Sequence, residues 1–328
     1  MKKVLVTGAD GFIGSHVVEA LHEAGYTVRA FCWYNAFNSL GWIDSLHPSI
    51  KNSLEIFMGD IRDAASIKKA ATNCEYIVHL AALITIPHSY HAPESYVQTN
   101  VTGTLNVLEA ARESGTKHTV ICSTSEVYGT AMQVPIEESH PLQAQSPYAA
   151  SKIAADALAV SYQKSFGLPV SIARPFNTFG PRQSARAVIS TLIIQLLAGA
   201  NEVFLGNISP RRDFVYVKDT ALAIVKLLDI ENPSAESFNI CSGNEITIGD
   251  LANMLISKIN PSAKICIDES RLRPENSEVY RLLGSYGKIK KATGWQPGHT
   301  FEEALDRTIE WYRNLENLKL FKPFQYNI

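Results

Sequence analysis

The chain has 328 residues, 46% of them hydrophobic and 19% charged, and its formal net charge is −2. This composition is typical of a soluble globular protein with one or two domains and a substantial core. The lack of a long basic run argues against nucleic-acid binding, and no stretch is long and apolar enough to span a membrane. Five cysteines without metal-type spacing predict reduced thiols and a cytoplasmic protein without a metal site.

The first predicted element is a short strand at residues 4–6, which leads into a glycine-rich turn and then a helix. Residues 15–24 carry apolar side chains at helical spacing. In this context glycines let the backbone turn tightly and approach a pyrophosphate at the helix N-terminus. The candidate cofactor contacts in this turn are Gly8, Gly11, Phe12, Ile13 and Gly14.

Strand and helix patterns then alternate through the first half of the chain. Strands are expected at 27–31, 54–57, 76–80, 119–123 and 170–174, and helices at 64–72, 94–114 and 147–166. Such alternation predicts an α/β fold with a doubly wound, Rossmann-type parallel sheet. After residue 176 the alternation breaks down. We therefore predict a dinucleotide-binding domain at 1–176 and a smaller α/β substrate lobe at 177–328, with some chain crossing back.

Ligands of doubly wound sheets bind beyond the carboxyl ends of the strands. The candidate cofactor contacts at these ends are Asp60, Ile61, Leu80, Ala81 and Ala82. The Asp60 carboxylate could accept from the adenine amino group or cap a loop. The end of the second strand, residues 31–35, has neither an acid for ribose hydroxyls nor a base for a 2′-phosphate. The missing base favours NAD and leaves NADP open.

Two segments carry side chains suited to catalysis. Tyr148 and Lys152 lie four residues apart on a predicted helix and therefore share a face. A nearby ammonium is expected to lower the phenol pKa from about 10, so that the phenolate can take a proton from a sugar hydroxyl. Thr124, Ser125 and Glu126 form the other segment. The Glu126 carboxylate offers a base that could remove a proton from carbon.

Taken together, these motifs resemble the extended short-chain dehydrogenase/reductase family, from residue 1 to about residue 315. Thr124, Ser125 and Glu126 are similar to the nucleotide-sugar 4,6-dehydratases, particularly the GDP-mannose type. The dTDP-glucose type has Asp at the position of Ser125. Four further segments resemble the N-acetylglucosamine 4,6-dehydratases of legionaminic acid biosynthesis, at 34–38, 180–186, 209–214 and 271–278.

This resemblance implies a UDP- or GDP-linked N-acetylglucosamine substrate and NAD as a catalytic cofactor. Tyr148 would take the C4 hydroxyl proton, and Thr124 would hydrogen-bond the C4 oxygen. Glu126 would remove the C5 proton and then protonate the departing C6 hydroxyl, because Ser125 is too weak an acid to do so alone. The expected substrate contacts are His88, Asn177, Arg186, Arg212, Asn239 and Arg273. The arginines suit a diphosphate through bidentate hydrogen bonds, although each could instead form a surface ion pair.

Other interpretations stay open. A nucleotide-glucuronate decarboxylase carries the same threonine, serine and glutamate, whereas a 4-epimerase has no use for Glu126. A cofactor-sensing regulator on this fold would not need the pair formed by Tyr148 and Lys152. Family members pair two helices into a dimer interface, so the helices at 94–114 and 147–166 predict a homodimer.

Overall fold

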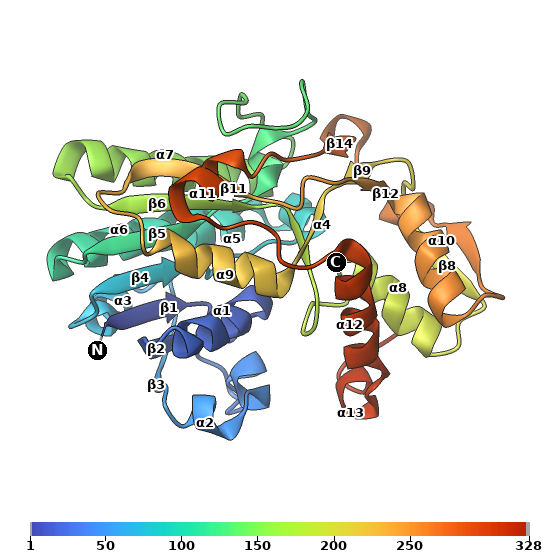
Figure 1. Cartoon of the computed structure of the whole chain (residues 1–328), viewed down its shortest axis with the longest axis horizontal. Coiled ribbons are helices and arrows are strands. Elements are labelled where there is room, and N and C mark those ends of the chain that lie inside the picture. The colour runs from blue at the N-terminus through green and yellow to red at the C-terminus, as the bar shows by residue number, and fades with distance from the viewer. Residues whose placement is uncertain (1, 326–328) are drawn as a thin grey trace.

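Seven parallel strands form the central sheet of this computed structural model, which describes residues 2–325, and Figure 1 shows the sheet with helices on both faces. The spatial order is β11-β6-β5-β4-β1-β2-β3. The strands are β1 (Lys3–Thr7), β2 (Thr27–Trp33), β3 (Glu55–Gly59), β4 (Tyr76–His79), β5 (His118–Cys122), β6 (Val170–Pro175) and β11 (Ser234–Ile240). Because the strand order reverses between β1 and β4, a ligand crevice is expected at their carboxyl ends. The predicted doubly wound fold is confirmed.

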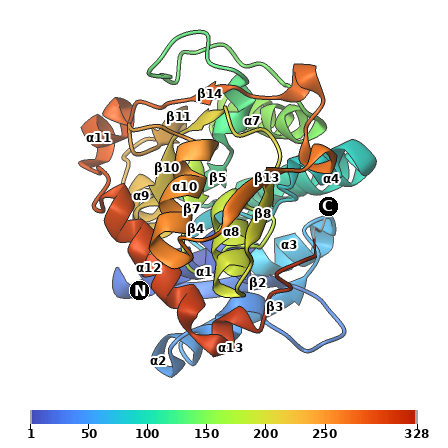
Figure 2. The same ribbon diagram turned by 90° about the vertical axis from the view of Figure 1, so that its right-hand side faces the viewer.

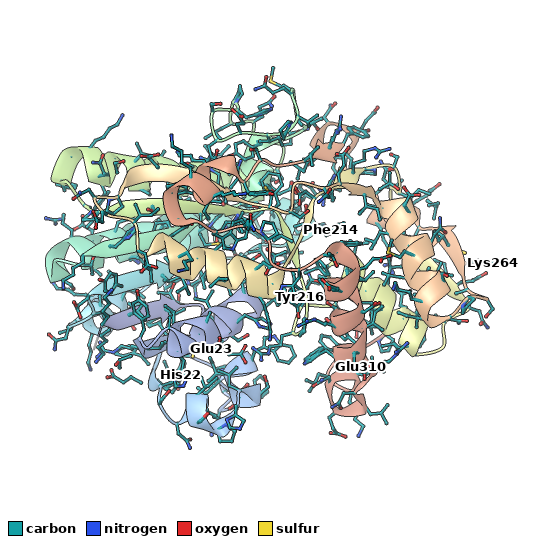
Figure 3. All side chains as sticks on the ribbon, viewed as in Figure 1. His22, Glu23, Phe214, Tyr216, Lys264 and Glu310 are labelled. Atoms are coloured by element: carbon teal, nitrogen blue, oxygen red, sulfur yellow. The ribbon has the colours of Figure 1, made fainter. Side chains whose placement is uncertain are left out.

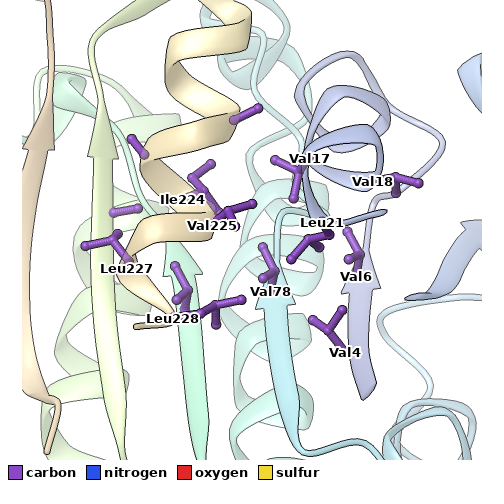
Figure 4. Close-up of a cluster of buried hydrophobic side chains, with 14 of the residues drawn as sticks. Val4, Val6, Val17, Val18, Leu21, Val78, Ile224, Val225, Leu227 and Leu228 are labelled. Atoms are coloured by element: carbon purple, nitrogen blue, oxygen red, sulfur yellow. The ribbon is translucent and has the colours of Figure 1, made fainter. Parts of the chain in front are cut away.

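Two sets of helices cover the sheet. The helices of this part are α1 (Phe12–Glu23), α2 (Pro48–Lys51), α3 (Ala64–Ala71), α4 (Ile86–His91), α5 (Pro93–Tyr96), α6 (Gly103–Ser114), α7 (Pro147–Phe166), α9 (Val217–Leu227) and α11 (Gly287–Thr293). On one face α1 and α9 pack side by side over strand residues such as Val6 and Val78 (Figure 4). On the other face α3 packs against α6, and α6 against α7.

The second lobe contains short sheets and three amphipathic helices. Its elements are β7 (Asn177–Phe179), α8 (Val188–Leu197), β8 (Glu202–Leu205), β9 (Arg211–Arg212), β10 (Phe214–Tyr216), β12 (Ile246–Thr247), α10 (Ile248–Ile259), β13 (Lys264–Ile267), β14 (Arg281–Leu282), α12 (Phe301–Arg313) and α13 (Leu315–Leu318). Figure 2 shows α8, α10 and α12 grouped together in this lobe. Phe214 and Tyr216 lie beside α12 in Figure 3 and belong to its core.

The chain returns from the second half to the first lobe. Strand β11 pairs in parallel with β6, and α9 shares a core cluster with α1. We propose a lobe boundary at residue 176, and α9 and β11 belong spatially to the lobe built on the central sheet.

The helix predicted at 94–114 is interrupted. Residues 93–96 form α5, Val97–Thr102 form a π-helix, and α6 begins at Gly103. Inside the π-helix, the Asn100 side chain accepts from the Leu83 amide and donates to the Leu83 carbonyl, each at 2.9 Å. It also donates to the Ser151 hydroxyl at 2.9 Å. The interruption therefore lets Asn100 join the segment after β4 to helix α7.

An ion pair links the two lobes, and we expect it to contribute to stability. Arg182 follows β7 and contacts the Glu19 carboxylate of α1 at 2.8 Å. Burial raises the pKa of Glu19, but hydrogen bonds from His16 and Arg182 outweigh it and lower the pKa to about 2. A carboxyl with a depressed pKa stabilises the folded state above its unfolded pKa, and that stability is lost as the pH falls through the folded value.

We therefore expect Glu19→Gln to lower the free energy of unfolding by about 2–3 kcal/mol at neutral pH. The difference from wild type should shrink between about pH 5 and pH 2. Urea titrations at several pH values would measure it. Glu23→Gln, at an exposed position on the same helix, is the control. A loss that stayed constant with pH would contradict the ion-pair explanation.

Candidate active site

The glycine turn packs directly against the end of β4. Gly8 has a φ of +69°, and a Cβ there would lie 2.8 Å from the Ala81 amide nitrogen. A Cβ on Gly14 would lie 2.0 Å from the Gly8 carbonyl oxygen. Gly11 is exposed and precedes Phe12, the first residue of α1. These close backbone approaches leave an open helix N-terminus, which fits the pyrophosphate of a dinucleotide.

The other predicted cofactor contacts surround this turn. Leu80 and Ala82 are half-buried on either side of Ala81, directly after β4. Ile61 is buried, and its side chain lies under Gly103, where an added Cβ would approach it to 3.0 Å. The structure thus brings the glycine turn and the end of β4 together. Ile61 instead packs against Gly103 at the start of α6.

Asp60 is engaged by a neighbouring arginine. Its carboxylate accepts from the Arg62 amide at 2.9 Å and forms a 2.5 Å ion pair with the guanidinium. This pairing lowers the Asp60 pKa. The guanidinium lies 5.7 Å from the centre of the Trp33 ring at the end of β2. A cation that the β2 sequence lacks therefore lies at the end of β2, but it is already paired with Asp60.

The catalytic candidates converge beyond β5. Thr124 caps the N-terminus of a short 3-10 helix, Ser125–Tyr128. Its hydroxyl accepts a hydrogen bond from the Glu126 backbone amide at 3.2 Å. Tyr148 and Lys152 share one face of α7, and Tyr148 is hydrogen-bonded to Thr124. All five side chains are at least nine-tenths buried, Glu126 being 9% exposed. A base, a hydroxyl and a phenol thus lie in one site.

The expected effect of Lys152 on Tyr148 is not seen in this structure. Burial raises the pKa of Tyr148, and this outweighs the lowering by its hydrogen bond to Thr124. The Lys152 ammonium donates to the Cys122 carbonyl at 2.6 Å. Burial also lowers the Lys152 pKa. The i,i+4 spacing was a correct guide to proximity, but desolvation of a phenol in an enclosed site opposes its ionisation.

Two aromatic side chains lie beside Tyr148: Tyr96, which sequence analysis missed, and the predicted substrate contact His88. The ring of Tyr96 is buried and meets the Tyr148 ring edge-on at 6.2 Å, and its hydroxyl donates to the Thr85 carbonyl at 2.5 Å. The His88 ring lies 5.8 Å from Tyr96. His88 is therefore next to the catalytic candidates, and no sequence periodicity identifies Tyr96 as part of the wall.

A buried charge cluster lies beside Glu126. Arg212 is 5% exposed, and its guanidinium lies 3.5 Å from the Glu278 carboxylate. Arg273 approaches the same carboxylate at 3.7 Å. Burial lowers the Arg212 pKa, whereas the negative charge of Glu126 favours its protonated form. Two arginines and two glutamates therefore form one charge cluster, and Glu278 is the member that sequence analysis missed.

The remaining substrate candidates divide into two groups. Asn177 begins β7, and its buried Oδ1 has no hydrogen-bond partner among the described residues. Arg186 is exposed before α8, and its charge lowers the Tyr96 pKa, although burial raises it more. Asn239, by contrast, is fully buried, accepting from the Tyr128 hydroxyl at 2.7 Å and donating to the Ile136 carbonyl at 3.0 Å. Its amide is a core bridge, which corrects the substrate-binding prediction.

No group of three His, Cys, Asp or Glu side chains is arranged to hold a metal ion in the part of the chain that the structure describes. Over the same residues, no helix is long and apolar enough to cross a membrane.

Comparison with known proteins agrees with this fold. A family model described as GDP-mannose 4,6 dehydratase matches residues 5–308. The dTDP-glucose 4,6-dehydratase of Streptomyces antibioticus is 31% identical over 315 residues, which are 95% of this chain and 92% of that protein. The crystal structure of DesIV, a dTDP-glucose 4,6-dehydratase from Streptomyces venezuelae with NAD bound, is 30% identical, covers 98% of this chain and 100% of that chain, and has a TM-score of 0.84.

A UDP-glucose 4-epimerase from Thermotoga maritima, solved with UDP-glucose, is similar at 28% identity and a TM-score of 0.84, covering 95% of this chain and 98% of its own. The chain belongs to the NAD-dependent epimerase/dehydratase family of extended short-chain dehydrogenases/reductases. It is an enzyme of the nucleotide-sugar dehydratase and epimerase group. Because related proteins carry either activity, the choice between them depends on the side chains of the site.

Proposed function

We propose that the protein catalyses 4,6-dehydration of a nucleotide-activated hexose, UDP- or GDP-N-acetylglucosamine, in the biosynthesis of a legionaminic acid-like sugar. The observation that supports dehydration is the buried carboxylate of Glu126: the backbone amide of this residue donates to Thr124, and its charge acts on Tyr148. Epimerisation at C4 needs a phenol and a hydroxyl but no second base. A carboxylate at this position gives the site a group that can remove the C5 proton.

NAD bound by Gly8, Gly11, Gly14, Ala81 and Lys152 would accept the hydride from C4 and return it to C6. The remaining steps belong to the chain itself. The Tyr148 phenolate takes the C4 hydroxyl proton while Thr124 holds the C4 oxygen, and the phenol returns that proton to solvent before the next turnover. Glu126 takes the C5 proton, the C6–O bond breaks, and the C6 hydroxyl leaves as water with the proton from Glu126. A solvent-derived proton then enters at C5. One water is lost, and the product is a 4-keto-6-deoxy sugar nucleotide.

Mass spectrometry in deuterated water tests this proposal. UDP- and GDP-N-acetylglucosamine are each incubated with the enzyme and NAD. Loss of one water with one solvent deuterium at C5 is the expected result, and the nucleotide that reacts identifies the substrate. Carbon dioxide release from a nucleotide glucuronate, with neither sugar changed, would instead establish a decarboxylase.

A 4-epimerase is the second candidate, because the similar Thermotoga maritima protein is a UDP-glucose 4-epimerase. The same experiment separates the two activities. Epimerisation leaves the mass unchanged and introduces no deuterium at C5, and the product differs only in its chromatographic retention.

We further propose that Arg212 binds the substrate diphosphate. Arg212→Gln is expected to raise KM about ten- to a hundredfold, because a hydrogen bond to a charged group contributes about 1.5–3 kcal/mol. Steady-state kinetics and the Kd of the nucleoside diphosphate would measure this. Arg211→Gln is the control, since Arg211 is exposed and its nearest carboxylate is Glu245 at 3.9 Å. A fall in kcat with unchanged KM and Kd would contradict a phosphate-binding role.

We also propose a homodimer through α6 and α7. Val97, the first residue of the π-helix that leads into α6, and Phe166, the last residue of α7, are 52% and 57% exposed. These exposed apolar side chains flank α6 and α7, which pack together, and this arrangement supports the proposed interface. Analytical ultracentrifugation would measure the assembly state.

A further inference from the structure

Asp10 lies between two glycines of the cofactor turn and reaches across to the end of β2. Its carboxylate accepts from the Trp33 amide, the last residue of β2, at 3.0 Å. Its backbone carbonyl accepts from the Trp42 amide at 3.0 Å. A Cβ on Gly41 would lie 2.5 Å from that carbonyl oxygen, so the loop after β2 closes tightly on Asp10. The carboxylate is thus fixed between the glycine turn and the strand end.

Backbone amides rather than a cation hold this carboxylate. Burial raises the Asp10 pKa, and hydrogen bonds from the amides of Trp33 and of Asp10 itself oppose it. The Asp10 charge also acts on Cys32 in β2. Burial is the larger cause and the Asp10 charge the next, and together they raise the pKa of the Cys32 thiol to about 12. An acid that the β2 sequence lacks is therefore supplied at its carboxyl end by the glycine turn.

The nearby cation is already neutralised. Arg62 lies over the Trp33 ring, but its guanidinium contacts both oxygens of Asp60, at 2.5 and 3.0 Å. A 2′-phosphate entering here would meet the Asp10 charge without an unpaired guanidinium to balance it. Ribose hydroxyls, which donate hydrogen bonds, are the complementary ligand for a carboxylate.

We propose that Asp10 is the specificity-determining residue for the cofactor: its carboxylate accepts from the adenosine ribose hydroxyls and repels a 2′-phosphate, so that the protein selects NAD over NADP. This inference rests on the proposed use of a nicotinamide dinucleotide by this enzyme. It assigns to the glycine turn the role that an acid at the end of the second strand has in many dinucleotide-binding proteins.

Isothermal titration of nucleotide-stripped protein with NAD and with NADP tests the inference. Asp10→Asn keeps an oxygen for the Trp33 amide and removes the charge. We expect NAD binding to weaken about tenfold and the NAD-to-NADP affinity ratio to fall about a hundredfold, since loss of one charged hydrogen bond and of one repulsion both contribute. Asp10→Ser, which removes the charge with a smaller side chain, should lower the ratio in the same direction.

Asp44→Asn is the matched control, because the Asp44 charge also influences Cys32 but its carboxylate pairs with Lys51 at 2.7 Å on the surface. Its affinity ratio should equal that of wild type. The inference is overturned if Asp10→Asn weakens both cofactors equally, if Asp44→Asn shifts the ratio as much, or if wild type binds NADP as tightly as NAD. The titration measures cofactor binding and not turnover. The affinity ratio therefore tests the role of Asp10 even if the dehydratase proposal fails.

Discussion

Tyr148→Phe is expected to reduce turnover about a thousandfold while leaving cofactor affinity within about a factor of two, because a positioned acid or base contributes about 10²–10⁴-fold. Tyr148, as the phenolate, is the group placed to take the C4 hydroxyl proton, and Thr124, its hydrogen-bond partner, has no comparable basicity. The near-ultraviolet absorbance of reduced nicotinamide would follow oxidation at C4 directly. That signal should disappear in the variant.

Tyr162→Phe provides the control for this substitution. Tyr162 lies on the same helix, and its hydroxyl donates to Glu109 of α6 rather than to a group of the site. Thermal unfolding of both variants would show whether α7 is intact. Equal loss of turnover in the two variants, or C4 oxidation at the wild-type rate in Tyr148→Phe, would count against the phenol as the base.

Local patterns predicted the parts of the site that lie close together in the sequence. The glycine spacing gave the approach of Gly8 and Gly14, and the i,i+4 spacing placed Tyr148 and Lys152 on one face of α7. Each depends on a strand or helix repeat, which a few residues define. The sheet was predictable for the same reason, since apolar runs alternate with helical periodicity along the first half.

Partners far apart in the sequence were not predictable in this way. Glu278 lies 66 residues from Arg212, and Asn239 lies 111 residues from the Tyr128 hydroxyl that it binds. Only the fold brings such pairs together, and burial then decides whether a polar side chain faces the site or the core. The Tyr148 pKa shows the same limit, because spacing reports proximity to Lys152 but not desolvation.

Glu126→Gln is expected to separate the two halves of the proposed reaction. Oxidation at C4 should persist, because Thr124 and Tyr148 are unchanged, while loss of water should fall at least a hundredfold without the C5 base. Rapid mixing would then show reduced nicotinamide accumulating together with a 4-keto sugar that retains its C6 hydroxyl. The glutamine carboxamide is nearly isosteric with the carboxylate, so the local backbone should not change. The hydrogen bond from the backbone amide of residue 126 to the Thr124 hydroxyl should therefore be retained.

The charge of Glu126 also acts on Arg212, which predicts a second, smaller effect. Arginine stays protonated at neutral pH with or without that charge, but the Glu126 carboxylate offsets part of the guanidinium charge that the diphosphate would meet. Glu126→Gln should therefore lower KM a few-fold, in contrast to its large effect on water loss. Glu126→Asp, which keeps the charge, should retain the wild-type KM while kcat falls, and Glu137→Gln at an exposed position is the control. Equal loss of C4 oxidation and water loss would show that Glu126 only shapes the site. An epimerase would retain full turnover in Glu126→Gln, so this one variant tests both the residue's role and the reaction.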